Sequence, residues 1–103
     1  MSSPKPPRLS PPEATRKIRQ ILEEGTVDYS GHCWHERMPQ RNVSALDIEY
    51  ILQEGQVIRE AEWDRTYRDW KYRVEGTDIE GDELTAITVI FEHDFSVLVV
   101  SVF

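Results

Sequence analysis

The chain has 103 residues, of which 39% are hydrophobic, 30% charged and 10% aromatic, a composition typical of one small globular domain. No apolar run approaches the roughly 20 residues that a membrane-spanning helix needs, and the single cysteine cannot form an intramolecular disulfide, so we expect a cytoplasmic protein without a membrane partner. The formal net charge of -7 argues against a protein that coats nucleic acid non-specifically.

The charge is unevenly distributed along the chain. Residues 1–41 hold seven Lys or Arg and five Asp or Glu, whereas the remainder holds five Lys or Arg and fourteen Asp or Glu. Four of the five cations in the remainder lie between Arg65 and Arg73. An anionic ligand would therefore prefer the N-terminal part or this later stretch.

The N-terminal part combines a tail with two helical patterns. Residues 1–9 are rich in proline and serine and predict a disordered tail, so that residues 10–103 form the single domain. Ser10 and Glu13 have the spacing of a capping box, and Gly25 stops the predicted helix. Its apolar face comprises Ala14, Ile18, Ile21 and Leu22.

A short strand is predicted over residues 26–29, and a second capped helix starts at Ser44 with Asp47 and stops at Gly55. Beyond it the hydrophobic period changes to two, which predicts strands over residues 56–63, 67–77, 84–91 and 95–103. The sequence therefore predicts an α+β fold, with two or three N-terminal helices packed on one face of an antiparallel sheet.

The segment from Gly31 to Arg41 holds the densest group of reactive side chains. As a helix it would carry His32, His35 and Glu36 on one face, and Pro39 is expected to end or kink it by the preceding residue. His32, Cys33 and His35 could ligate a metal, with His93 as a further donor, but structural zinc sites commonly use two spaced ligand pairs. We therefore expect no metal and no cofactor, and Cys33 is interpreted as a buried thiol.

Metal-free RNA cleavage is the other chemical hypothesis. Attack by a 2′-hydroxyl needs a base, an acid for the leaving oxygen and fixed cations around the phosphorane. His32 or His35 could move the protons. The arginines that could hold phosphate are Arg37, Arg41 and Arg73, and the aromatic side chains that could stack a base are Tyr67, Trp70 and Tyr72, with Lys71 as a further contact. Each residue also has a structural interpretation, because Trp70 and Tyr72 suit a sheet core and the arginines could pair with acids.

The run His32-Cys33-x-x-x-Arg37-Met38-x-x-Arg41-x-Val43-Ser44-x-x-Asp47-Ile48, followed by Ile51-Leu52-x-x-Gly55-x-Val57, resembles a small bacterial domain of unknown function. From about Ile18 onward the chain also resembles the motility quorum-sensing regulator toxins, within the RelE-like class of small ribonucleases. The resemblance implies a RelE-like fold, mRNA interferase activity and an antitoxin partner.

Residue by residue, the resemblance implies roles for His32, Arg37 and Arg41, and for Tyr72 and Arg73 on a later strand, with His35 as the rival of His32. The chain departs from the RelE-like pattern on the last strand, where such toxins often carry a catalytic polar residue and this chain offers only Ser96 and Ser101 among apolar residues.

Two functions follow as hypotheses. The first is an endoribonuclease toxin that acts on RNA, free or on the ribosome. The second is a non-catalytic module that uses the same surface to bind a protein. A homodimer formed through a sheet edge is a third arrangement that the pattern allows.

Overall fold

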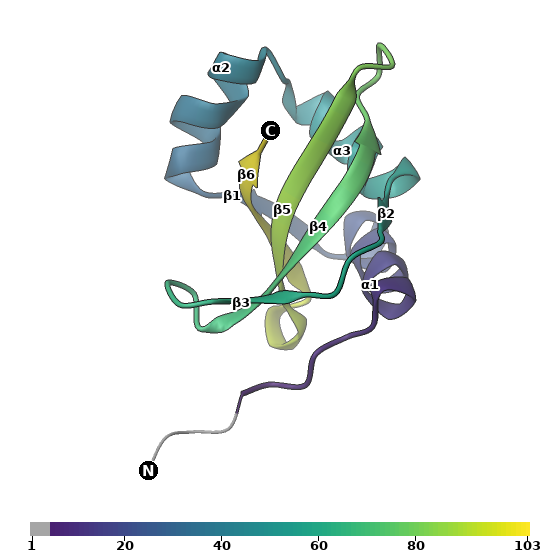
Figure 1. Ribbon diagram of the computed structural model, residues 1–103, viewed down its shortest axis with the longest axis vertical. Coiled ribbons are helices and arrows are strands. Elements are labelled where there is room, and N and C mark those ends of the chain that lie inside the picture. The colour runs from purple at the N-terminus through teal and green to yellow at the C-terminus, as the bar shows by residue number, and fades with distance from the viewer. Residues whose placement is uncertain (1–4) are drawn as a thin grey trace.

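The computed structural model describes residues 5–103 (Figure 1). Residues 1–4 of the predicted tail lie outside the described residues. The rest of that segment has defined contacts, since the Pro6 carbonyl accepts a hydrogen bond from the indole N–H of Trp70 and the Leu9 amide donates to the hydroxyl of Tyr72. Whether this segment is flexible in solution stays a prediction.

Both predicted helix caps are confirmed. Helix α1 (Pro11–Glu24) starts with a capping box in which Ser10 and Glu13 exchange hydrogen bonds, and α3 (Ala45–Glu54) has the same arrangement between Ser44 and Asp47. These bonds satisfy backbone donors that the first turn of a helix leaves unpaired. The residues that the two helices bury are Ala14, Ile18, Ile21, Ile48, Ile51 and Leu52.

The strands are β1 (Thr26–Tyr29), β2 (Gln56–Val57), β3 (Glu62–Asp64), β4 (Asp69–Thr77), β5 (Glu83–Phe91) and β6 (Ser96–Val102). The single strand predicted over residues 56–63 is wrong, because β2 and β3 are separate strands that pair with different parts of β4. The predicted strand over residues 67–77 starts later, at Asp69, since a turn with Arg68 at a φ of 53° precedes it.

The strands form one sheet in the order β1-β6-β5-β4-β2, with β3 also paired to β4. Strands β4, β5 and β6 are antiparallel neighbours, as predicted, but β1 runs parallel to β6, so the sheet is mixed. β1 runs parallel to β6 because the two strands start side by side. The amide of Thr26, at the beginning of β1, donates to the carbonyl of Phe95, just before the beginning of β6. Local periodicity identifies a strand but not its partner.

Helices α1 and α3 lie behind the sheet in Figure 1. We call the side of the sheet that they cover the core face; Tyr72, Val74, Ala86, Val97 and Val99 belong to its buried cluster. We call the opposite side the outer face; by strand alternation it carries Lys71, Arg73, Ile87, Leu98 and Ser101. The predicted α+β class, with the N-terminal helices packed against the sheet, is confirmed.

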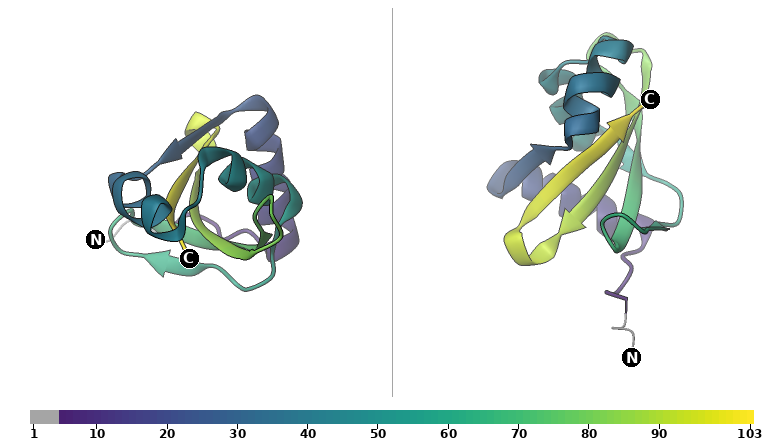
Figure 2. Two further views of the ribbon diagram at one scale, coloured as in Figure 1. Left: turned by 90° about the horizontal axis from the view of Figure 1, so that it is seen from above. Right: turned by 90° about the vertical axis from the view of Figure 1, so that its left-hand side faces the viewer.

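A second helical segment lies beside β6, near the C label in the right-hand view of Figure 2. It consists of a π-helical turn, η1 (Cys33–Arg37), and the short helix α2 (Met38–Arg41). A 3-10 turn, η2 (Glu92–Asp94), joins β5 to β6. Among residues 5–103, no helix is both long enough and apolar enough to cross a membrane.

Candidate functional site

The segment from Gly31 to Arg41 stays helical to its end, so the expectation that Pro39 ends the helix is wrong, and the alternative expectation of a kink there stays a prediction. The amide of Met38 donates to the carbonyl of Cys33, five residues back, which makes the turn before Pro39 a wide one. Pro39 then lies in the first turn of α2, where its missing N–H costs little. Asn42, at a φ of 53°, ends the segment.

The wide turn sets which side chains face the sheet. Cys33 and Met38, five residues apart, are buried together in the core. Trp34 packs against the ring of Tyr29 at 5.4 Å and lines a shallow groove with Ala45, on the side of α3. Arg37 instead reaches the end of β6, where its Nε donates to the carbonyl of Val102 at 3.2 Å.

The histidines of this segment are at its surface. Nδ1 of His32 lies 2.7 Å from the Glu36 carboxylate, and both side chains are more than half exposed. His35 is exposed as well. A carboxylate that holds one imidazole nitrogen orients the ring and leaves Nε2 free for proton transfer.

Three predicted arginines meet around the last residues of β6. Besides Arg37, Arg41 donates to the carbonyl of Glu83 at 3.4 Å and lines a groove of ≈ 500 Å³ with Phe103. Arg73, on β4, holds its guanidinium 5.6 Å from the ring of Phe103. We call Arg37, Arg41 and Arg73 the arginine group. They come from three different elements, so only the folded chain brings them together.

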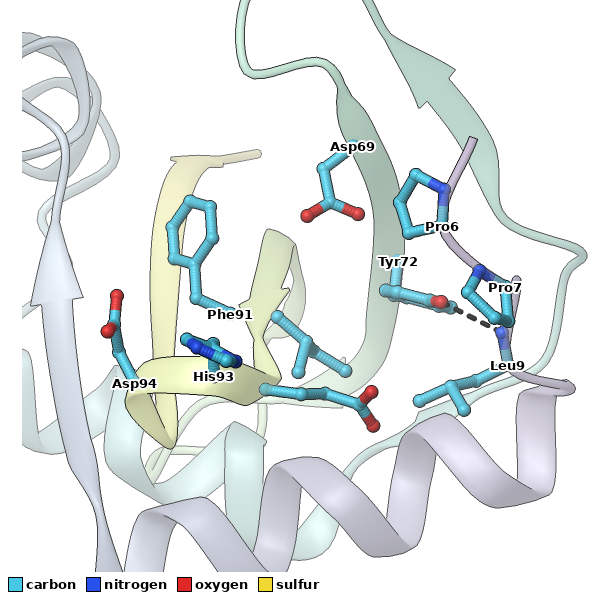
Figure 3. A pocket seen from close by; sticks show the side chains of 10 residues that line it. Pro6, Pro7, Leu9, Asp69, Tyr72, Phe91, His93 and Asp94 are labelled. Atoms are coloured by element: carbon cyan, nitrogen blue, oxygen red, sulfur yellow. Dashed lines mark hydrogen bonds between the residues drawn. The ribbon is translucent and has the colours of Figure 1, made fainter. Parts of the chain in front are cut away.

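Tyr72 does not join the arginine group. It is the neighbour of Arg73 on β4, so its side chain lies on the core face, where the hydroxyl accepts a hydrogen bond from the Leu9 amide at 3.0 Å (Figure 3). Burial raises the pKa of Tyr72, and the hydrogen bond from Leu9 partly opposes this. A cavity of ≈ 260 Å³ beside the tyrosine is also lined by His93, Asp94 and Asp69 (Figure 3).

The predicted base-binding residues are spread over the sheet. Lys71 lies on the outer face, two residues before Arg73. Trp70 packs edge-to-face against Trp63, with ring centroids 5.2 Å apart. Tyr67 belongs to the turn before β4, where its amide bonds to the side chain of Asp64. Only Lys71 therefore shares a face with the arginine group.

The possible metal ligands point in different directions. Cys33 is fully buried, and burial raises the pKa of its thiol to about 11, while His32 and His35 face outward. His93 lies on η2, in the cavity beside Tyr72. Within residues 5–103 no three His, Cys, Asp or Glu side chains come close enough together to hold a metal ion.

Two residues near the arginine group were not predicted as site residues. Phe103 falls in an apolar run that predicts a sheet core, yet its side chain is 42% exposed. Ser101 pairs with Ile87, which pairs in turn with Arg73, so the hydroxyl and the guanidinium lie in one row of the outer face. A register shift between Ile87 and Thr88 sets this row, and such a shift has no local sequence signal.

Comparison with known proteins identifies one family. The model of the Domain of unknown function (DUF4258) matches residues 29–103, which include the helical segment, the arginine group and the sheet strands from β2 to β6. The chain therefore belongs to this family. No curated protein and no solved structure matches the chain.

Proposed function

We propose that this member of the DUF4258 family is a cytoplasmic, metal-independent endoribonuclease of the toxin type found in toxin–antitoxin pairs. The observation that carries the proposal is that Arg37, Arg41 and Arg73 all lie near the end of β6: Arg37 at the Val102 carbonyl, Arg41 in a groove with Phe103, and Arg73 over the Phe103 ring. Arginine forks bind phosphate oxygens in pairs and keep their charge at any physiological pH. Two of them, Arg41 and Arg73, lie beside the exposed ring of Phe103, and such an arrangement suits a phosphodiester with an adjoining base.

We assign the proton transfers to a histidine of the segment that also carries Arg37 and Arg41. His32 would take the proton of the 2′-hydroxyl on Nε2, since Nδ1 is held by Glu36. The 2′-oxygen then forms a bond to phosphorus, the bond from phosphorus to the 5′-oxygen breaks, and the leaving 5′-oxygen takes a proton from water, which His32 replaces when it releases its own proton to the solvent. The arginine group would stabilise the negative charge of the phosphorane. His35 is the alternative proton carrier. It lies in η1 and its side chain is exposed, so RNA in solution could reach it.

This mechanism predicts the products and the sensitive residues. Purified protein should cut single-stranded RNA, or mRNA in a translation extract with ribosomes, and leave a 2′,3′-cyclic phosphate and a 5′-hydroxyl. His32→Ala and Arg73→Ala should each reduce the rate by 10²-fold or more, the usual range for a lost base or charge stabiliser. His93→Ala and Arg16→Ala are the matched controls, because His93 lies on η2 and Arg16 is exposed on α1.

The competing function is a non-catalytic protein-binding module. Its support is that two of the three arginines already donate to backbone carbonyls, at Val102 and Glu83, in a chain of net charge -7. If RNA stays intact with and without ribosomes, and His32→Ala still forms the same stable complex with a partner protein, this function replaces the first.

The partners follow from the first proposal. RNA or the ribosome would face the arginine group, and an antitoxin would cover it, so expression without the antitoxin should arrest growth. A homodimer through an edge strand is the remaining arrangement; in the described sheet β1 forms one edge, and β2 and β3, which both pair only with β4, form the other. Sedimentation of the purified chain distinguishes a monomer from a dimer.

A further inference from the structure

The segment Lys5–Leu9 lies across a pair of tryptophans at the far end of the sheet from the arginine group. Trp63 on β3 and Trp70 on β4 are paired residues, and their rings meet edge-to-face with an interplanar angle of 77°. The indole N–H of Trp70 donates to the carbonyl of Pro6 at 2.7 Å. We call Trp63 and Trp70 the indole pair, and Lys5–Leu9 the arm.

Basic side chains on both sides of the prolines extend the contact. The ammonium of Lys5 is 4.8 Å from the ring of Trp63 and 5.5 Å from that of Trp70. The guanidinium of Arg8 is 5.4 Å from the Trp70 ring and forms an ion pair with Glu60 at 3.0 Å. Every one of these contacts uses a feature of the sequence Lys-Pro-Pro-Arg: a cation, a proline carbonyl or a second cation.

Such contacts are those that proteins use to recognise proline-rich peptides. A residue before proline is restricted to extended conformations, so the segment loses little entropy on binding. Proline has no N–H, so a proline-rich segment does not pair as a regular strand. Its carbonyl oxygens can then accept hydrogen bonds from side-chain donors such as an indole. Grooves lined by aromatic rings read these segments, and flanking cations add cation–π and ionic contacts.

We propose that the indole pair is a binding site for a basic, proline-rich segment of a partner protein, and that the arm occupies this site in cis. The arm also forms part of the wall of the cavity beside Tyr72, through Pro6, Pro7 and Leu9 (Figure 3). A partner that displaces the arm therefore gains the indole pair and opens that cavity. This site is independent of the proposed ribonuclease activity, which uses the other end of the sheet.

The tether determines how strongly the arm competes. A short linker holds its ligand at an effective concentration of about 1 mM, so a peptide with an intrinsic Kd of about 100 μM would bind the wild-type chain roughly tenfold more weakly than a chain without a competing arm. Weakening the contacts of the arm should therefore raise the affinity of the indole pair for an added peptide.

The experiment uses the full chain and a synthetic peptide with the sequence of residues 5–10. The arm variant combines Lys5→Ser, Pro6→Gly and Arg8→Ser, which removes both cations and the backbone restriction that Pro6 imposes. Binding is followed by the NMR signals of the indole N–H groups. We expect the peptide to bind the arm variant about tenfold more tightly than the wild type, with shifts at Trp63 and Trp70.

Three controls make the result specific. A peptide with both prolines replaced by alanine should bind at least tenfold more weakly. Trp70→Phe in the arm variant should abolish binding, because the phenyl ring lacks the donor, while Trp34→Phe should leave it unchanged. Trp34 is the matched control because it is an exposed indole that packs against Tyr29. Tyr29 ends β1, which lies at the opposite edge of the sheet from β3.

The proposal is overturned if the peptide binds the folded arm variant and the wild type equally, or binds neither. If the arm variant fails to fold, millimolar peptide added to the wild-type chain decides the question. It must then shift the signals of Trp63 and Trp70 and leave that of Trp34 in place, and the absence of such shifts overturns the proposal.

Discussion

Tyr72 and Arg73 are adjacent on β4, and their side chains lie on opposite faces of the sheet. The hydroxyl of Tyr72 accepts a hydrogen bond from the Leu9 amide next to the core, whereas the guanidinium of Arg73 lies over the ring of Phe103. We therefore expect the two residues to affect different properties of the protein: the tyrosine its stability, and the arginine the proposed RNA cleavage.

Tyr72→Phe tests this division. The substitution removes the acceptor of the Leu9 amide and should lower the free energy of unfolding by about 1 kcal/mol, the usual net value of such a hydrogen bond. RNA cleavage should remain at the wild-type rate. Arg73→Ala should show the reverse pattern, with little change in urea unfolding. Loss of cleavage in a folded Tyr72→Phe protein would mean that the hydroxyl reaches the reaction.

Gly55→Ala probes the close approach of α3 to β4. A Cβ atom at Gly55 would lie 2.6 Å from the carbonyl oxygen of Ile51 and 2.9 Å from that of Glu75. Both are backbone atoms, so helix and strand must separate, at a cost of about 1–3 kcal/mol. Thermal unfolding measures the loss. Gly31→Ala is the control: no heavy atom lies within 4 Å of its Cβ position, and alanine in a helical turn should raise the melting temperature slightly.

Asp47→Ala should have a pH-dependent effect. Hydrogen bonds from Ser44, opposed by desolvation and aided by the Ile79 amide, hold the pKa of Asp47 below its ordinary 3.8. Because the folded pKa is the lower one, the stabilisation is complete above the unfolded pKa and is lost as the pH falls through the folded pKa. We expect the variant to be about 1 kcal/mol less stable at pH 7.

Urea titrations at several pH values measure this difference. It should disappear in acid, where the carboxyl group is protonated in both states. Glu49→Ala, an exposed position on the same helix, should show no comparable loss at any pH. A difference between Asp47→Ala and the wild type that stays constant down to pH 2 would contradict the assignment to the ionised carboxylate.

Cys33 should be chemically inert in the folded protein. Its pKa of about 11, against an ordinary 9.0, reflects burial, so the thiolate fraction at pH 8 falls about 100-fold. A disulfide reagent should therefore react only as fast as the chain unfolds, and urea should accelerate the reaction. Rapid reaction of the native protein would show that solvent reaches the thiol. The folded pKa is the higher one, so burial of the neutral thiol contributes fully to stability below pH 9. This contribution is lost as the pH rises toward 11.

The helices and their ends were predictable from local chemistry. Ser10 with Glu13, and Ser44 with Asp47, form their capping boxes within four consecutive residues, and Gly25 and Gly55 follow the last turns. All the interactions that define these ends lie inside one turn of chain, so the sequence pattern contains them completely. The α+β class follows from the same kind of periodicity.

The candidate site was predictable only as a set of residue types. Arg37, Arg41 and Arg73 were identified from the sequence, and they do gather at one place; Tyr72 was grouped with Arg73, but strand alternation places it on the other face. The π turn before Pro39, in which the Met38 amide bonds to the carbonyl five residues back, was not predicted from the sequence.

By itself, the sequence determined where α1 and α3 begin and end, and it located β1, β4, β5 and β6 to within two residues, since these features depend on neighbours within a few residues. Only the tertiary structure decided that β1 runs parallel to β6, that Phe103 lies beneath Arg73, and that Pro6 meets Trp70. Those contacts join residues 30 to 70 positions apart. Their partners are selected by how the sheet twists and which faces the helices cover, and no short window of the chain contains that information.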